Sequence, residues 1–306
     1  MLEILKKTVK DSDFKKLDSL EVGSWIAAVD PTPEELAYLT DTLGLDKKNI
    51  TDALDEYELP RIEKDENAIY VLIKVPVENK ETVATIPIGI VLTDRYILTI
   101  IKKENRVINN IREKKQKIFT TQKINLMTHL FLFASDAYEH DLKNISKEIS
   151  LRKAKITDLS NKDIVNLIKS EEVLNEFISS FHPMVNIFEK LLGGKYIPLY
   201  QQDKDLIEDL LVNSRQTLDL SQSNVKTVIN IREAYSTVLS NNLNKIIKVL
   251  TFFTIFLAIP TTIASIYGMN IPLPMQDHPQ VFNYVATGAL LIMSLLFFVF
   301  LKKRWI

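Results

Sequence analysis

The sequence predicts an α/β cytoplasmic domain, a long stalk helix and two C-terminal transmembrane helices. Three observations support this fold class. Residues 249–268 and 281–301 are long apolar runs without a charged side chain. The stretch from Leu199 to Ile259 contains no glycine and no proline. The first 120 residues instead hold runs of alternating β-branched side chains bounded by turn residues.

The α/β domain is expected over residues 1–120, where a strand and a helix come first. WIAAVD at 25–30 is short and apolar, which is typical of a strand. TPEE at 32–35 places a threonine before a proline, with a glutamate three residues after the threonine. This order predicts a helix N-cap, a proline in the first helical position and a capping box. We expect this helix to end near Gly44.

Two longer strand regions follow in the same domain. AIYVLIKVPV (68–77) and IPIGIVLTDRYILTIIK (86–102) alternate β-branched side chains. Thr93-Asp94-Arg95 predicts a turn inside the second region. We therefore expect a sheet in this domain.

A helical hairpin region is predicted over residues 121–198. Segments 123–150 and 161–192 are helix-like, and Gly193-Gly194 supplies a C-terminal stop for the second segment. Together with the helix that follows, these segments are expected to pack side by side.

The stalk helix is predicted over residues 199–268, where it continues into the first membrane span. Sixty helical residues are about 90 Å long. Apolar side chains recur along the helix at Val225, Val228, Ile231, Tyr235 and Val238. Such a helix needs packing partners, and a continuous one can transmit a movement of the domain to the membrane.

Each uncharged run, at about 249–268 and at 281–301, is long enough to cross roughly 30 Å of hydrocarbon. A buried hairpin in a soluble core is the alternative, but two such runs in succession are rare in soluble folds. Basic residues flank the pair at Lys245, Lys248, Lys302, Lys303 and Arg304. The connecting loop 269–280 has no lysine or arginine. We therefore expect two spans in the cell membrane, with the loop outside and both termini, including the basic tail 302–306, in the cytoplasm.

Charge and cysteine content exclude several classes of protein. The chain has 38 basic and 39 acidic residues, of which five basic and one acidic follow Asn244. Residues 1–244 therefore carry about five net negative charges, which argues against nucleic-acid binding and favours cations. There is no cysteine, so disulfides and thiolate metal sites are excluded. The N-terminus lacks the apolar core of a signal peptide, so the large domain is expected to stay in the cytoplasm.

No catalytic arrangement is visible, and we expect neither an enzyme nor an organic cofactor. The chain has seven glycines and no glycine-rich phosphate loop. Its four histidines, His129, His140, His182 and His278, form no metal-binding pair. The first three fall within predicted helices and are interpreted as structural. His278 lies beside Asp277 in the outer loop, where the pair either meets an arriving cation or is simply solvated.

A stripe of small and polar residues follows one face of the first span. Thr254, Ala258, Thr261 and Ser265 are spaced by four, three and four residues, so they share a helix face. The same face extends backwards to Leu250, Ile247 and Asn244. One interpretation is close helix packing, with hydroxyls bonded to the preceding turn. The other is a pore wall, which requires a ring of identical chains.

The end of the first span carries a family signature. Tyr267-Gly268-Met269-Asn270 resembles the GMN motif of the CorA family of divalent-cation (magnesium) channels, which stands at the same place before a short loop and a second span. WIAAVDPTPEEL, LDEYELPRIEKDENAIYVLIKVP and NNLNKIIKVLT also resemble segments of that family. The resemblance covers the whole chain.

The resemblance implies a funnel-shaped homopentamer that carries Mg²⁺, with Co²⁺ and Ni²⁺ as further ions. The five first spans would line the pore, and the five second spans would surround them. Tyr267, Gly268, Met269 and Asn270 would form the selectivity filter, in which a ring of Asn270 carboxamides binds the water shell of the ion. The implied pore-lining positions are Asn244, Ile247, Leu250, Thr254, Ala258, Thr261 and Ser265. Ile247 and Leu250 would form an apolar gate.

The family also senses cytoplasmic Mg²⁺ through carboxylates between neighbouring subunits. The resemblance places one partner on Asp209 and the other near Glu78, with Asp205 and Glu208 as close competitors. A solvated acid on an exposed face is the alternative for each. A bridging ion would hold the ring symmetric and shut.

Two departures from the family leave other functions open. Ile247 stands where relatives often place methionine, and the outer loop has only Asp277 where relatives often have more acids. One alternative is a zinc or other transition-metal transporter on the same scaffold. The other is a membrane-anchored cytoplasmic sensor or scaffold, which would need neither the hydroxyl stripe nor Asn270.

Overall fold

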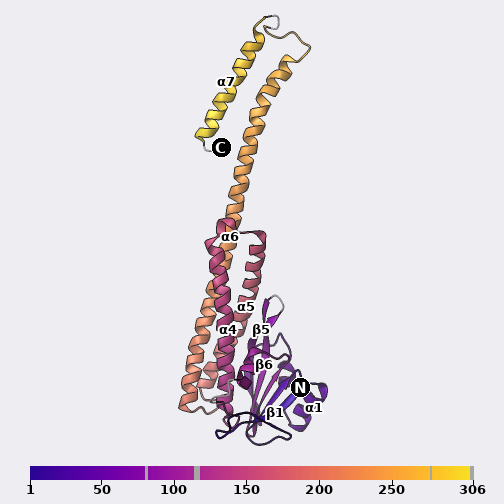
Figure 1. The fold of residues 1–306 in the computed structure, drawn as a ribbon, viewed down its shortest axis with the longest axis vertical. Helices are drawn as coiled ribbons and strands as arrows, with labels where there is room; N and C mark the ends of the chain where they lie inside the picture. Colours follow the sequence, from indigo (N-terminus) through magenta and orange to yellow (C-terminus); the bar gives the residue numbers. More distant parts are fainter. Residues whose placement is uncertain (80–81, 114–117, 276–277, 304–306) are drawn as a thin grey trace. The chain divides into compact units, whose positions relative to one another are not determined.

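The computed structural model describes residues 1–79, 82–113, 118–275 and 278–303, with backbone only at residues 78, 79 and 82. The chain divides into two units, Met1–Ile231 (unit 1) and Arg232–Ile306 (unit 2). The predicted fold class is confirmed: a mixed sheet domain is followed by a long helix and a C-terminal apolar helix (Figure 1).

One sheet organises the N-terminal part of unit 1. In the described part of the chain it has seven strands in the order β2-β1-β3-β7-β6-β5-β4. The strands are β1 (Leu2–Lys6), β2 (Lys15–Leu17), β3 (Ser24–Val29), β4 (Arg61–Lys64), β5 (Ala68–Asn79), β6 (Thr82–Thr93) and β7 (Tyr96–Ile101). β3 and β7 are parallel, and the other neighbours are antiparallel. The predicted turn at 93–95 separates β6 from β7.

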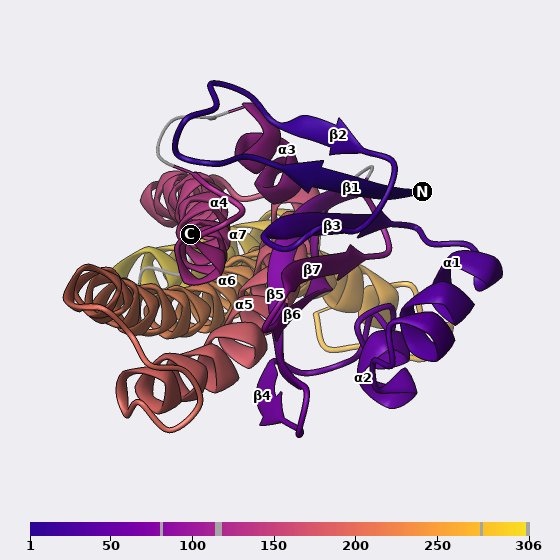
Figure 2. The same ribbon diagram turned by 90° about the horizontal axis from the view of Figure 1, so that it is seen from below.

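Both faces of the sheet are buried. Successive side chains of a strand point to opposite faces, and in the central strands the side chains on both faces are apolar. Along β3, Trp25 and Ala27 belong to one hydrophobic cluster, whereas Ile26 and Ala28 belong to another. The first cluster lies under α3 (Arg106–Glu113) and α4 (Lys123–Ala154). Figure 2 shows α1 (Pro33–Ala37) and α2 (Lys47–Asp52) on the opposite face.

The predicted capping box starts α1. The Thr32 side chain accepts a hydrogen bond from the Glu35 N–H, and a Glu35 carboxylate oxygen accepts one from the Thr32 N–H at 2.9 Å. Burial alone would raise the pKa of Glu35, but hydrogen bonds from the N–H groups of Thr32 and Leu2 hold it below its usual value. The helix continues as one wider turn, η1 (Tyr38–Thr42), and Gly44 follows with φ of +68°. The expected end near Gly44 is therefore confirmed.

Two long helices form the predicted hairpin. They are α4 and α5 (Asn161–Leu192), joined by the short turn η2 (Ile156–Asp158). Tyr138 of α4 packs edge-on against Phe177 and Phe181 of α5, with ring centroids 4.8 and 4.5 Å apart. Helix α5 ends at the predicted glycine pair Gly193-Gly194, where Gly194 has φ of +71°.

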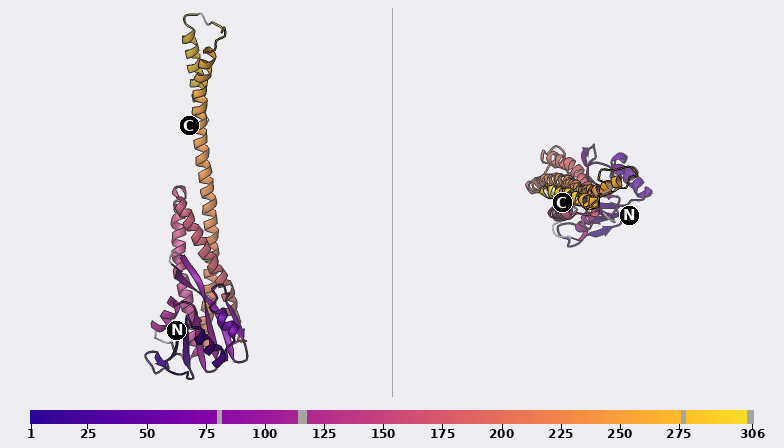
Figure 3. Two further views of the ribbon diagram at one scale, coloured as in Figure 1. Left: turned by 90° about the vertical axis from the view of Figure 1, so that its right-hand side faces the viewer. Right: turned by 90° about the horizontal axis from the view of Figure 1, so that it is seen from above.

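Helix α6 (Gln201–Tyr267) runs from unit 1 into unit 2, and α7 (Val281–Lys302) follows it. In unit 1, Val228 and Ile231 of α6 are buried in the same cluster as the α4–α5 hairpin, with Val225 packed against it. Within unit 2, α7 returns alongside the C-terminal part of α6 (Figure 3). Each of the two helices contains an apolar stretch long enough to cross a membrane, and almost none of either stretch is buried.

Candidate functional site

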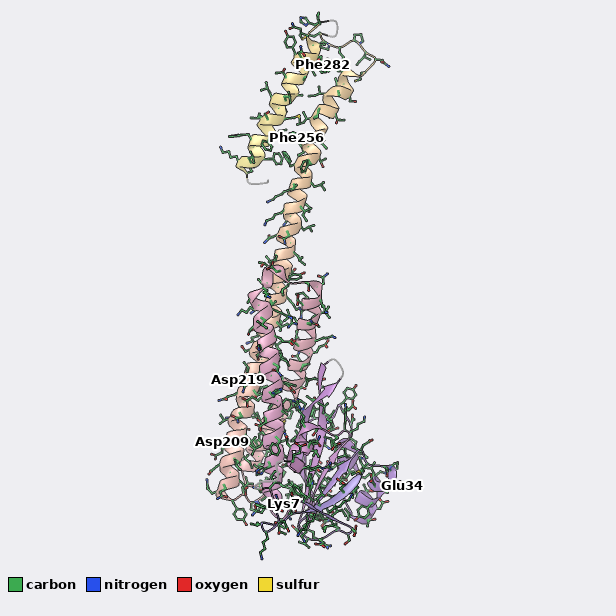
Figure 4. The ribbon with its side chains drawn as sticks, viewed as in Figure 1. Lys7, Glu34, Asp209, Asp219, Phe256 and Phe282 are labelled. Atoms are coloured by element: carbon green, nitrogen blue, oxygen red, sulfur yellow. The ribbon has the colours of Figure 1, made fainter. Side chains whose placement is uncertain are left out.

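Helix α7 covers one face of α6 in unit 2. The Phe252 ring of α6 lies 6.0 Å from that of Phe297 and 5.3 Å from that of Phe300 in α7. Nearer the C-terminal end of α6, Pro260, Ile263 and Tyr267 line a cavity of about 490 Å³ together with α7 residues that include Phe282 and Ala286. Figure 4 labels Phe256 and Phe282 on the two helices.

The polar stripe lies on the opposite face of α6. At about 100° of rotation per residue, the seven stripe positions are centred about 150–160° from the positions that face α7. All seven are exposed in the single chain: Asn244, Ile247, Leu250, Thr254, Ala258, Thr261 and Ser265. The stripe is therefore available to another chain or to an aqueous path, and α7 does not occupy it.

Two stripe hydroxyls have a defined orientation. Thr254 Oγ1 donates to the Leu250 carbonyl at 2.9 Å, and Thr261 Oγ1 donates to the Leu257 carbonyl at 2.8 Å. These bonds to the preceding turn satisfy the hydroxyl hydrogens inside the helix. The lone pairs of both oxygens remain available as acceptors on the exposed face.

The GMN segment, Gly268-Met269-Asn270, follows directly after the last residue of helix α6. Tyr267 is the last residue of α6, the Gly268 N–H donates to the Ala264 carbonyl at 2.9 Å, and the chain bends through Met269 and Asn270. A Cβ on residue 268 would lie 3.2 Å from the Ala264 carbonyl oxygen. Gly268 does not have a positive φ, so close approach, and not a left-handed backbone, favours glycine here. Asn270 is exposed.

The two carboxylates expected to bind a regulatory ion, Asp209 and Glu78, are far apart in the sequence. The structure describes the side chain of Asp209 but not that of Glu78. Asp209 is exposed on α6, as are Asp205 and Glu208 (Figure 4). The backbone of Glu78 pairs with Val83 near the end of the β5–β6 hairpin, but its side chain lies outside the described residues. Among the side chains that the structure describes, no group of three histidines or acids gathers within one chain. A carboxylate pair between chains stays a prediction.

The loop between α6 and α7, which was predicted to lie outside the membrane, is described only in part. Asp277 lies outside the described residues. His278 Nδ1 accepts a hydrogen bond from the Gln280 N–H at 3.2 Å, and its ring lies beside Tyr284. Within a helix of unit 1, His129 Nδ1 lies 2.8 Å from the Asn125 carbonyl, which fits its expected structural role.

The sequence reasoning did not single out a row of bulky side chains beside the stripe. Leu239, Leu243, Ile246 and Leu250 are exposed on α6, at spacings of four, three and four residues. The same periodicity that identified the stripe identifies this row once the exposure of each side chain is known.

Comparisons with known proteins agree with this geometry. The full-length CorA magnesium transporter of Methanocaldococcus jannaschii has the same fold, with a TM-score of 0.87 over 100% of this chain and 99% of that one, at 24% identity. The cobalt/magnesium transport protein CorA of that organism is 28% identical over 292 residues, covering 92% of this chain and 91% of the relative. The cobalt/magnesium transport protein CorA of Thermotoga maritima is 22% identical over 273 residues, covering 86% of this chain and 77% of the relative.

The family model described as CorA-like Mg²⁺ transporter protein matches residues 21–303. That match includes unit 1 from β3 onwards, both candidate membrane helices and the segment between them. The chain belongs to the CorA-like Mg²⁺ transporter family.

Proposed function

We propose that this chain conducts hydrated Mg²⁺ passively across the cell membrane through a ring of five copies, with Co²⁺ and Ni²⁺ as further ions. The observation that carries the proposal is the exposed stripe of α6, which faces away from α7 and leads to Gly268-Met269-Asn270. Membership of a family of Mg²⁺ transporters supports transport as the function, and transport through such a pore needs no catalytic residue.

In the proposed assembly, residues 249–268 and 281–301 span the membrane, the loop 269–280 is outside, and both termini are cytoplasmic. The five copies of α6 line the path, and the five copies of α7 separate them from lipid. The positive flanks Lys245, Lys248, Lys302 and Lys303 support this orientation.

The stripe fits an ion that keeps its water. Mg²⁺ dehydrates reluctantly, and the waters bound to it point their hydrogens outwards. A path for the hydrated ion therefore needs hydrogen-bond acceptors, which the oriented oxygens of Thr254 and Thr261 supply. The carboxamide oxygen of Asn270 would supply a further ring of acceptors at the outer end, where a full charge would be costly. Tyr267 and Met269 would hold that ring in place.

Ile247 and Leu250 would form the gate. Both side chains are at least half exposed in the single chain, and both lie on the stripe. A ring of such side chains can exclude water when it narrows, which closes the path without a charged plug. Asp209, with Glu78 of a neighbouring copy, would hold the closed state by sharing a cytoplasmic Mg²⁺, which is then both cargo and regulator.

The test is ion flux into proteoliposomes that contain the purified full chain. Asn270→Ala should lower Mg²⁺ flux about tenfold or more, because a hydrogen bond to a charged partner is worth roughly 1.5–3 kcal/mol. Asn283→Ala is the matched control, since Asn283 lies exposed near the start of α7 and off the stripe. Its flux should equal that of the unchanged chain.

Other results would overturn the proposal in different ways. Zn²⁺ flux without Mg²⁺ flux would assign the chain to zinc transport on the same scaffold. No flux of any tested ion into proteoliposomes that contain intact protein would favour a membrane-anchored sensor. Mg²⁺ flux that survives Asn270→Ala would keep transport but remove the carboxamide ring as the filter.

A further inference from the structure

The cavity between α6 and α7 is not part of the proposed ion path. It has a volume of about 490 Å³, and its walls on α6 are Pro260, Ile263, Ala264, Tyr267 and Gly268. At about 100° per residue, these positions are centred about 125° around the helix from the polar stripe. The cavity therefore lies on the side of α6 that faces away from the proposed path.

The sizes of the facing side chains explain why this cavity forms. At the other end of the helix pair, aromatic rings fill the space between α6 and α7, with the Phe252 ring 6.0 Å from that of Phe297 and 5.3 Å from that of Phe300. Towards the loop, several of the facing residues are small: Ala264, Gly268, Ala286 and Ala289. Small residues leave volume unfilled where aromatic rings have set the spacing of two helices.

The cavity has the depth of one membrane leaflet. Its walls belong to residues 260–268, which end the first uncharged run, and to residues 281–289, which begin the second. The rise from Pro260 to Gly268 is about 12 Å at about 1.5 Å per residue. Half of a hydrocarbon core of roughly 30 Å has a similar thickness. In the proposed orientation, this is the leaflet next to the loop 269–280.

The lining of the cavity fits hydrocarbon and not water. Among the described residues that line it, only Tyr267 has a side-chain oxygen or nitrogen. An ordered water needs roughly two to four hydrogen-bond partners, which these walls do not supply. An empty cavity would leave the side chains around it without dispersion contacts. Its volume falls in the range of roughly 300–1,000 Å³ that is typical of pockets holding a small molecule.

We propose that this cavity binds one acyl chain of a membrane phospholipid. The proposal rests on the proposed function in taking the two uncharged runs to span the membrane, where acyl chains surround the protein. No lysine or arginine occurs from residue 249 to residue 301, so the site recognises hydrocarbon and not a charged headgroup. Tyr267 suits the end of such a site, because its ring is apolar and its hydroxyl favours the membrane–water interface.

The bound acyl chain contacts the segment that leads to the proposed filter. Tyr267 and Gly268 line the cavity, and Met269 and Asn270 follow them directly. The lipid therefore packs against the backbone that carries Asn270, from the side opposite to the ion path.

A phospholipid with a photoreactive diazirine in the middle of one acyl chain tests the site in proteoliposomes of the full protein. After illumination, mass spectrometry of peptides should find the label on three reporter residues of the cavity wall, Ile263, Ala264 and Val285. Label on Tyr284, which is exposed and does not line the cavity, is the reference that shows membrane insertion.

Two substitutions fill the cavity with an aromatic ring. Ala286→Phe and Ala289→Phe should each lower the labelling of the reporter residues several-fold relative to Tyr284, because the ring takes the place of the acyl chain. Thr287→Phe is the matched control, since Thr287 is exposed at the same depth and does not line the cavity. Its labelling should equal that of the unchanged protein. Neutral and anionic headgroups on the same photoreactive chain should give equal labelling.

Several results would overturn the proposal. Equal labelling of all variants would indicate general contact with bulk lipid. Label on Tyr284 but not on the reporter residues would indicate that protein closes the cavity, for example side chains of a neighbouring copy. Labelling only by the anionic lipid would indicate recognition of the headgroup. Mg²⁺ flux without label in the cavity would remove the lipid site and keep the proposed function, whereas label in the cavity without any ion flux would keep the site and remove conduction.

Discussion

Gly89 shows how closely one residue can be constrained by its neighbours. It lies in β6, where a Cβ would come within 2.6 Å of both the Ala53 Cβ and the Ile100 Cγ2. No flexible side-chain end occupies that space, so the loop after α2 or strand β7 would have to move. Glycine is therefore required here by close packing of backbone and side chains, not by its conformational freedom.

We predict that Gly89→Ala lowers the free energy of unfolding of unit 1 by about 1–3 kcal/mol, the usual cost of overpacking a core. Thermal unfolding of the purified full chain, followed by circular dichroism, measures the change. Gly193→Ala is the control, because a Cβ there would make only ordinary contacts at 3.5 Å. Equal stability of the two variants would contradict the tight packing at Gly89.

At the same scale, the parts of the candidate site that are local patterns of residue types could be predicted from the sequence. The stripe, the GMN segment and the capping box at 32–35 are local patterns, and the sequence contains them in full. The orientation of the Thr254 hydroxyl and the closeness of Gly268 to the Ala264 carbonyl depend on atoms that only the folded helix brings together. The proposed partner of Asp209 belongs to another copy, so the structure of a single chain does not bring the two side chains together.

Among the elements, those with a clear apolar run or a capping signal were predictable, whereas short elements without such a signal were not. β3, β5, β6 and β7 carry clear apolar alternation, and α4, α5 and α6 carry strong helical stop and spacing signals. The expected elements omitted β1, β2, β4, α2 and α3. Each of these has eight residues or fewer, so its apolar period is too short to stand out from a loop. The parallel pairing of β3 with β7 was also unpredictable, because the two strands are some seventy residues apart.

The exposed stripe of α6, which lines the proposed path, leads to a prediction for this helix. Thr254→Val keeps the side-chain shape but removes the acceptor oxygen, so the hydrated ion loses one hydrogen-bond partner per copy. We expect Mg²⁺ flux to fall about tenfold, which corresponds to about 1.4 kcal/mol. Thr254→Ser should retain most of the flux in the same proteoliposome assay, because serine can donate to the Leu250 carbonyl in the same way. If the valine variant conducts like the unchanged chain, Thr254 has no role in the water path.

For the whole molecule, the proposed regulation requires that cation binding to unit 1 affects the proposed path along α6. The net negative charge of residues 1–244 favours cation binding, and α6 continues without interruption from unit 1 into unit 2, which gives that binding a physical route to the stripe. Bridging by Mg²⁺ can favour the closed state only if it binds that state more tightly. The exposed position of Asp209 on α6 allows such a bridge to a neighbouring copy.

We predict that Asp209→Asn raises several-fold the internal Mg²⁺ concentration that half-inhibits flux, because one ligand charge is lost from each bridge. Flux at low internal Mg²⁺ should not change. Asp219→Asn is the control, since Asp219 is an equally exposed acid on the same helix (Figure 4). Flux into proteoliposomes over a range of internal Mg²⁺ gives both numbers. An unchanged inhibition curve for Asp209→Asn would shift the role to Asp205 or Glu208.

The exposed stripe of α6 has a genetic consequence under the proposed function. Each copy would supply only one part of the wall of a shared path, so a copy with a damaged stripe would still enter assemblies of normal copies and spoil the path that all of them share. In a cell that makes both versions, a recessive loss of function would become a dominant one, and the severity would rise steeply with the share of damaged copies.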